Sequence, residues 1–283
     1  MRIDLGYLTE KRACAEGREW FAAHFPDGGD YQAVLDALAA EDHAGWAQWL
    51  MAHAGATDAV LEIDGDLRSE RSIFFAGHVR VKGSILTSKE LLAGGGIEAG
   101  EGIEAGWGIE AGEGIKAGGG IEAGEGIKTG WGIEAGRGIE AGEGIKAGWG
   151  IEAGEGIEAG WGIKAGGGIK TGEGIKAGWG IEAGRGIEAG EGIKAGEGIK
   201  AGRGIEAGEG IEAGEGIKAG RGIEAGWGIE AGRGIEAGDD YEIFAGLRVR
   251  RSLKAQYAVV MAQERPKNLA AGVYREPKGQ PNG

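Results

Sequence analysis

An aliphatic residue returns at every sixth position through most of this chain. From Ile97 to Ile235 that residue is Ile without exception, in the unit Gly-Ile-(Glu/Lys)-(Ala/Thr)-Gly-X, where X is Glu, Trp, Arg or Gly. The same register continues outward to Leu61 and Val259 through segments of different sequence. Residues two positions apart point to the same side of a strand, and the Glu or Lys between them faces water. The pattern therefore predicts one continuous structure over residues 61–261, with a short strand in each unit and a turn at X.

A strand this short cannot bury its Ile alone, but stacked coils place each Ile on the Ile of the next coil. We therefore predict a mostly β chain folded as a hexad-repeat β-solenoid. Arg185, Arg203 and Arg221 recur at 18-residue intervals, which favours three strands per coil. Trp149 and Trp161 lie 12 residues apart, which suits two strands per coil. A flat two-sided solenoid is thus the alternative to the three-sided one.

Residues 1–58 carry a helical pattern instead. Apolar residues at spacings of three and four predict helices over 13–25, over the segment that begins after Asp30, and over 44–54, with Asp30 as a helix N-cap. A unit of this size is only marginally stable alone, so we expect this helical head to pack against the first coil. The solenoid is predicted to span 59–262, and a Pro- and Gly-containing disordered tail to span 263–283.

Glycine occupies 65 positions, whereas Pro occurs only 4 times, and we interpret the glycines beside X as turn residues with positive φ. The formal charge of −14 makes nucleic-acid binding an unfavourable interpretation, because that function requires a net basic surface. The single cysteine, Cys14, excludes an intramolecular disulfide and fits a reducing compartment. Since the sequence shows no apolar signal segment and no membrane-length apolar run, we expect a cytoplasmic protein without membrane contact.

No motif in the chain supplies catalytic chemistry. The His residues lie outside metal-ligand spacings, and the many Glu side chains repeat in identical surroundings rather than as a pair with distinct environments. Phosphate-binding glycine motifs followed by a helix are also missing. We therefore predict no catalytic, cofactor-binding or metal-binding residues, and a protein that is not an enzyme.

Tryptophan at X is the one chemically unusual feature of the repeat. X lies on the corners of the predicted coil, so these rings should face outward, either over neighbouring glycines or as contacts for another protein. With two Trp of the head they form the set of interaction candidates: Trp107, Trp131, Trp149, Trp161, Trp179, Trp227, Trp46 and Trp49.

The first part of the repeat resembles a known family. In Leu61-Glu-Ile-Asp-Gly-Asp-Leu67 and Gly77-His-Val-Arg-Val-Lys-Gly-Ser-Ile85, the inward pair is the aliphatic residue and the residue two after it. This pattern resembles the right-handed β-helix of bactofilins, which are polymer-forming bacterial cytoskeletal proteins, and the resemblance implies a right-handed coil. Left-handed hexapeptide β-helices place a small inward residue two before the aliphatic one, where this chain has Trp, Arg and Glu. The helical head and the uniform repeat depart from the bactofilin pattern.

Two functions fit this architecture. The first is a non-enzymatic structural or scaffold protein that self-associates or displays its head, because solenoid ends expose strand edges and the head is in position to cap one of them. The alternative is an acidic, rod-like binding or inhibitory protein, either a nucleic-acid mimic or an immunity or anti-defence protein. Both predict a protein partner or a second copy of this chain. The Trp46-Ala-Gln-Trp49-Leu50 stretch of the head also resembles a small helical module of phage and bacterial repeat proteins.

Overall fold

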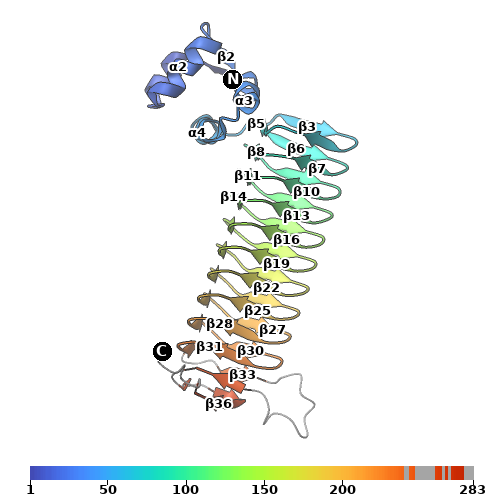
Figure 1. Cartoon of the computed structure of the whole chain (residues 1–283), viewed down its shortest axis with the longest axis vertical. Helices are drawn as coiled ribbons and strands as arrows, with labels where there is room; N and C mark the ends of the chain where they lie inside the picture. The colour runs from blue at the N-terminus through green and yellow to red at the C-terminus, as the bar shows by residue number, and fades with distance from the viewer. Residues whose placement is uncertain (239–241, 246–258, 263–264, 267–268, 277–283) are drawn as a thin grey trace, which may run out of the picture.

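The computed structural model describes residues 1–238, 242–245, 259–262, 265–266 and 269–276, and it shows a rod of stacked coils with helices at its N-terminal end (Figure 1). The strands of the rod form three parallel sheets of 12, 12 and 10 strands. Each sheet is one face of the rod, and we name the faces after their first strands as the β3 face, the β4 face and the β5 face. The predicted mostly β solenoid is confirmed.

The strands follow one another from face to face around the rod. The β3 face contains β3 Val60–Ile63, β6 His78–Val81, β9 Ile97–Ala99, β12 Ile115–Ala117, β15 Ile133–Ala135, β18 Ile151–Ala153, β21 Ile169–Thr171, β24 Ile187–Ala189, β27 Ile205–Ala207, β30 Ile223–Ala225, β33 Ile243–Ala245 and β35 Leu269–Ala271. The β4 face contains β4 Leu67–Ser69, β7 Ile85–Thr87, β10 Ile103–Ala105, β13 Ile121–Ala123, β16 Ile139–Ala141, β19 Ile157–Ala159, β22 Ile175–Ala177, β25 Ile193–Ala195, β28 Ile211–Ala213, β31 Ile229–Ala231, β34 Val259–Met261 and β36 Val273–Arg275. The β5 face contains β5 Ile73–Phe75, β8 Leu91–Ala93, β11 Ile109–Ala111, β14 Ile127–Thr129, β17 Ile145–Ala147, β20 Ile163–Ala165, β23 Ile181–Ala183, β26 Ile199–Ala201, β29 Ile217–Ala219 and β32 Ile235–Glu236.

The strand register shows how many sides the coil has. Each repeat residue pairs with the residue 18 positions away, as Ile103 does with Ile121 and Ala105 with Ala123. Three six-residue units therefore complete one coil, so the three-sided solenoid is confirmed and the two-sided alternative is wrong. Trp149 and Trp161, which are 12 residues apart, lie on different corners of the three-sided coil. The right hand of the coil stays a prediction.

Inside the coil the side chains form uniform ladders. The Ile of each unit stacks on the Ile of the neighbouring coils and is buried, as is the Ala two residues later. The predicted inward and outward positions are thus confirmed through the central repeat. Thr129 and Thr171 stand where other units have Ala, and each buried hydroxyl donates a hydrogen bond to a backbone carbonyl two residues on, at 3.0 and 2.7 Å respectively. A buried polar group with a partner costs little stability.

The repeat glycines do not have the role predicted from composition. Among the described glycines only Gly28, Gly55 and Gly272 have positive φ, so the prediction of positive-φ turns beside X is wrong. The glycine before X instead lies against the backbone of the previous coil. A Cβ on Gly196 would lie 1.9 Å from the carbonyl oxygen of Gly178, which is far inside van der Waals contact. Stacking of the central coils therefore leaves no room for a side chain at Gly196, whereas Lys82 and Ser88 occupy the equivalent position in the second coil.

The register changes near the C-terminal end. Ile243 pairs with Ile223, 20 residues away, and Val260, rather than the predicted Val259, pairs with Ile229. The prediction of an unbroken six-residue phase to residue 261 is therefore wrong. The same phase predicts five further inward residues, and all of them lie outside the described part of the chain: Tyr241, Leu247, Val249, Leu253 and Ala255.

Two strands continue the rod beyond the predicted solenoid. β35 pairs in parallel with β33, and β36 pairs in parallel with β34. Tyr274 donates a side-chain hydrogen bond to the carbonyl oxygen of Ala262 at 2.9 Å. The predicted disordered tail is therefore wrong for residues 269–275, because this segment satisfies backbone groups that the edges of β33 and β34 would otherwise leave unpaired. Residues 277–283 lie outside the described residues.

The head contains more structure than predicted. It consists of α1 Leu5–Glu10, α2 Ala15–His24, α3 Tyr31–Ala40 and α4 Ala44–Ala54, with an antiparallel pair of β1 Arg2–Ile3 and β2 Gly29–Asp30. The three predicted helices correspond to α2, α3 and α4, whereas α1 and the strand pair were not predicted. The Asp30 carboxylate accepts a hydrogen bond from the backbone N–H of Gln32 at 3.0 Å, which confirms Asp30 as the N-cap of α3. Ile3, Phe21 and Leu35 lie in the head's core.

Candidate interaction surfaces

The helical head docks on the outer side of the β5 face. Phe74 and Leu92 occupy outward positions where the repeat has Glu or Lys, and both are buried in the apolar core of the head. The side chain of Gln32 donates to the carbonyl oxygen of Phe74 at 2.8 Å and accepts from the amide of Ala76 at 2.9 Å. The expected packing of the head against the first coil is confirmed, since α3 lies beside β5 (Figure 1).

The first coil leaves this end of the rod open. β3, β4 and β5 are the outermost strands of their sheets. Their inward residues are partly exposed, whereas their counterparts in the next coil are buried: Leu61, Ile63, Leu67, Ile73 and Phe75 against Val79, Val81, Ile85, Leu91 and Ala93. The head packs its apolar side chains against Phe74 and Leu92, on the outer side of the β5 face. The expectation that the head caps the end is therefore wrong.

The two candidate Trp residues of the head take part in its packing. Trp46 stacks on His43 with ring centroids 4.1 Å apart, and Trp49 stacks on His53 at 4.2 Å. Both indole rings are half-buried and pack against the core of the head. Trp46 and Trp49 are therefore packing residues of the head. Their contact with another protein stays a prediction.

A polar cluster joins α2 to the turn before α4. Glu41 accepts a hydrogen bond from the Trp20 indole at 2.7 Å and interacts with His24 and His43 at 3.0 and 3.5 Å. The bond from Trp20, followed by the charge and hydrogen bond of His24 and the charge of His43, lowers the pKa of Glu41. The cluster thus links α2 to the segment between α3 and α4 within the head. Within the described residues no group of three or more His, Cys, Asp or Glu side chains has the arrangement of a metal site.

The six repeat Trp residues lie on corners and face outward, with exposed fractions from 40% for Trp107 to 65% for Trp149 and Trp227. Trp161 and Trp179 stack on neighbouring coils with centroids 5.6 Å apart and planes 9° from parallel. The corner between the β4 and β5 faces carries Trp107, Trp161 and Trp179, the corner between the β5 and β3 faces carries Trp131 and Trp149, and the third corner carries Trp227. Five of the six rings therefore border the β5 face.

The three faces differ in charge. Over eight consecutive coils the outward residue of the β3 face and of the β4 face is Glu six times and Lys twice, whereas on the β5 face it is Lys five times and Glu three times. The outward residues of the β5 face are Glu110, Lys128, Lys146, Lys164, Glu182, Lys200, Lys218 and Glu236. The rod is thus acidic on two faces and basic on the face that also holds the head.

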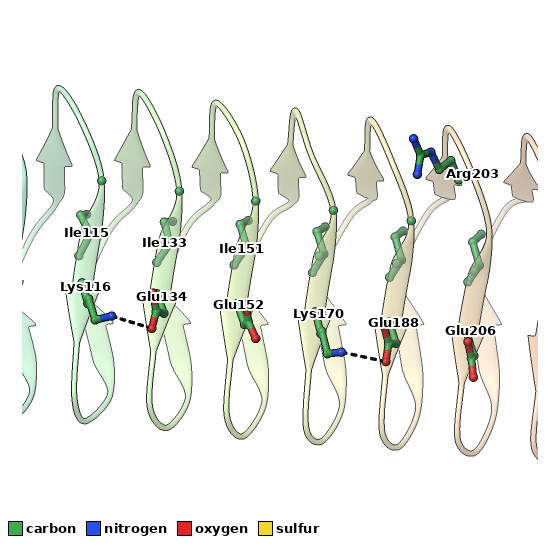
Figure 2. A pocket seen from close by; sticks show the side chains of 18 of the residues that line it. Ile115, Lys116, Ile133, Glu134, Ile151, Glu152, Lys170, Glu188, Arg203 and Glu206 are labelled. Carbon is green, nitrogen blue, oxygen red and sulfur yellow. Dashed lines mark hydrogen bonds and ion pairs between the residues drawn. The ribbon is translucent and has the colours of Figure 1, made fainter.

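A shallow groove runs along each face between its outward side chains and a row of corner residues. Figure 2 shows the groove of the β3 face, where Lys116 pairs with Glu134 at 2.9 Å and Lys170 pairs with Glu188 at 3.2 Å. These pairs join neighbouring coils and are solvent-exposed, so each contributes no more than about 1 kcal/mol. The grooves present regularly spaced charges, which suits contact with another repeating surface.

The architecture defines a repeat protein with a three-sided parallel β-solenoid and a docked helical domain. The first 56 residues match the family model described as the YdhT N-terminal domain, which covers the head. No curated protein and no solved structure matches the chain. The comparisons therefore support no bactofilin relationship beyond the shared β-solenoid architecture. None of the described helices has both the length and the apolar character needed to cross a membrane.

Proposed function

We propose that this chain is a non-enzymatic structural scaffold that joins a second copy through its open first coil and carries its head on the flank of the joined rods. The partly exposed inward residues of that coil, such as Leu61, Leu67 and Phe75, carry the proposal. Apolar side chains and unpaired strand edges that end in water are unfavourable. The first coil of a second copy supplies both missing partners, because it presents the same apolar ladder and the same edges.

Two N-terminal ends that meet in this way make an isologous contact, which closes once two rods have joined. The expected product is a dimer of twice the rod length, with the two heads beside the junction. The head packs on Phe74 and Leu92 at the β5 face and projects past the first coil (Figure 1), so the second rod must meet this end beside the head.

Sedimentation velocity at roughly 0.5 M salt, where charged contacts between rods are screened, tests this function. The wild-type chain is expected to dimerise, and Leu67→Lys is expected to be monomeric because a charge then lies among the apolar residues of the open end. Glu140→Lys, an outward change in the middle of the β4 face, is the matched control and should leave the dimer intact. A wild-type chain that stays monomeric at every concentration would refute the proposal.

The acidic binding or inhibitory rod is the second candidate, and one ridge favours it. Glu155, Glu173, Glu191 and Glu209 follow one another, exposed, along the corner between the two acidic faces. Closely spaced negative charges of this kind suit a basic groove on another protein. A monomeric wild-type chain that co-sediments with a basic DNA-binding protein and displaces a DNA duplex from it would favour this function over the scaffold.

A further inference from the structure

The backbone of each strand in the first coil has one side towards the second coil and one side towards the open end. In a strand the N–H and C=O of one residue point to the same side, and successive residues alternate. In β5, the N–H of Ile73 donates to the second coil at 2.8 Å, and the carbonyl oxygen of Phe75 accepts from it at 2.9 Å. The backbone groups of Phe74 and Ala76 lie at the alternate positions and therefore face the open end.

A side chain of the head takes the place of a neighbouring strand at this edge. Gln32, in the first turn of α3, donates to the carbonyl oxygen of Phe74 at 2.8 Å and accepts from the N–H of Ala76 at 2.9 Å. One residue of a neighbouring parallel strand engages the same two groups, a carbonyl and the N–H two residues later. A glutamine amide can replace that residue because it carries the donor and the acceptor of a peptide group.

The segment between the head and β3 adds a further bond at the same edge. The N–H of Thr57 donates to the carbonyl oxygen of Ala76 at 2.9 Å. Three backbone groups at the end of β5 that face the open end are thus satisfied: the Phe74 carbonyl and both groups of Ala76. The end of β5 is therefore closed by side-chain and backbone contacts, although the apolar packing of the head lies on the flank.

The edges of β3 and β4 lack such contacts. The carbonyl oxygen of Ile63 accepts from the second coil at 2.9 Å, so the backbone groups of Glu62 face the open end. In β4, the N–H of Leu67 donates to the second coil at 2.9 Å, so those of Arg68 also face the open end. In the part of the chain that the structure describes, no hydrogen bond reaches Glu62 or Arg68 from that side. The open coil therefore offers two adjacent strand edges.

We propose that Gln32 determines which edges of the open coil receive a second copy, because it keeps the end of β5 closed and confines strand pairing to β3 and β4. This inference rests on the proposed scaffold and adds the residue that controls its contact. The head also projects past the first coil on the β5 side (Figure 1), so a second rod can pair with β5 only after Gln32 has been displaced. The docked head thus limits the strength of the end-to-end contact.

Sedimentation velocity at roughly 0.5 M salt compares the wild-type chain with Gln32→Ala. Loss of the amide frees two backbone groups of β5 for the partner, and two added hydrogen bonds should tighten the dimer by about tenfold or more. Gln48→Ala removes an exposed amide from α4 and is the matched control, which should leave the dissociation constant unchanged. Gln32→Glu keeps the length of the side chain but cannot donate to the Phe74 carbonyl, so it should tighten the dimer as well.

Hydrogen exchange shows which edges pair. In the wild-type chain the amides of Glu62 and Arg68 should exchange more slowly in the dimer than in the monomer, whereas the Ala76 amide should exchange equally slowly in both. In Gln32→Ala the Ala76 amide should exchange fast in the monomer and slowly in the dimer, because the partner replaces the lost side chain. Wild-type dimers in which Glu62 and Arg68 gain no protection would contradict pairing at β3 and β4.

The scaffold and the role of Gln32 fail in different ways. Equal dissociation constants for the wild-type chain and Gln32→Ala would overturn the role of Gln32 and leave the scaffold standing. A wild-type chain that stays monomeric while Gln32→Ala dimerises would exclude the scaffold for the docked chain and support Gln32 as the residue that closes β5. Monomers of both would exclude both proposals. Should Gln32→Ala fail to fold, Gln32→Glu provides the same comparison.

Discussion

The first coil and the central coils share one folding unit but meet different demands. A central coil has a neighbour on each side, and identical Ile and Ala ladders with glycine corners satisfy both contacts. The first coil has a neighbour on one side only, and its inward residues are larger and more varied, from Leu61 to Phe75. Its outward positions also change, because Phe74 receives the head. A uniform repeat sequence thus indicates coils that stack on both sides. A diverged sequence indicates a coil that contacts the head or lies at the open end of the rod.

Replacement of a central glycine should give the largest effect. Gly196→Ala would bring a Cβ to 1.9 Å from a backbone oxygen of the previous coil, whereas Gly198→Ala would place one 3.4 Å from the next coil. The first change forces the coils apart and should cost about 3 kcal/mol or more, while the second should stay within about 1 kcal/mol. Urea denaturation followed by circular dichroism measures both. Equal losses for the two variants would contradict close stacking as the reason for the glycine before X.

Truncation of an inward residue compares the two kinds of coil directly. Ile157 and Leu67 lie at equivalent positions of the β4 face, but Ile157 is buried and Leu67 is partly exposed. Ile157→Ala should cost about 2–5 kcal/mol, since it loses apolar burial and leaves a cavity between two coils. Leu67→Ala should cost about half as much or less, because part of its side chain already contacts water.

Unfolding of both variants is measured at protein concentrations low enough to keep the chains monomeric. A loss at Leu67 as large as that at Ile157 would indicate that the first coil is covered in solution. That result would contradict the open end on which the scaffold depends.

The regular part of this fold was predictable because one physical constraint repeats. Ile at every sixth place from Ile97 to Ile235 fixed the strands and their inward face, and the 18-residue spacing of Arg185, Arg203 and Arg221 indicated three sides. The predictions were wrong where that constraint ends. The two-residue shift at Ile243 arises between β32 and β33, and the hydrophobic pattern does not restrict the length of a connection between strands. Composition also could not distinguish glycine chosen for positive φ from glycine chosen for close stacking.

The surfaces were less predictable than the fold, because they depend on which units share a face. Outward placement of residues such as Trp161 followed from their place at X, but their gathering around the β5 face appears only once the coil has three sides. Lys128, Lys146 and Lys164 were visible as an 18-residue series, yet a series along the chain indicates coil size as readily as a charged surface. Docking of the head through Gln32 has no sequence signal, since one polar side chain forms both backbone contacts.

Loss of that docking should give a moderate effect confined to the first coil. Gln32→Ala removes the partners of the Phe74 carbonyl and the Ala76 amide, and unsatisfied groups of this kind cost about 1–2 kcal/mol. Hydrogen exchange should show faster exchange at Ala76 and in the head, with the central coils unchanged. Gln48→Ala, an exposed position of α4, is the control and should leave exchange at Ala76 as it is.

The smallest expected effect concerns a carboxylate beside the docked head. One oxygen of Glu90 is buried and has no hydrogen-bond partner among the residues that the structure describes. Burial, followed by the charges of Glu125, Glu110 and Asp42, raises the pKa of Glu90. The folded state therefore binds this proton more tightly than the unfolded state does. Its contribution to the free energy of unfolding falls as pH rises from the ordinary Glu pKa through the raised one, and the penalty is complete above that range.

Glu90→Gln keeps the shape of the side chain and removes the charge, so it should raise the free energy of unfolding at pH 7 by on the order of 1 kcal/mol. The gain should shrink as pH is lowered towards the ordinary pKa of a glutamate, because the wild-type carboxyl is then protonated in both states. Glu140→Gln, on an exposed outward position of the β4 face, should show no such gain. If Glu90→Gln raises the free energy of unfolding equally at low and neutral pH, the buried charge of Glu90 is not the cause of the gain. The stability difference between the coils beside the head and the central coils at this position then comes from packing alone.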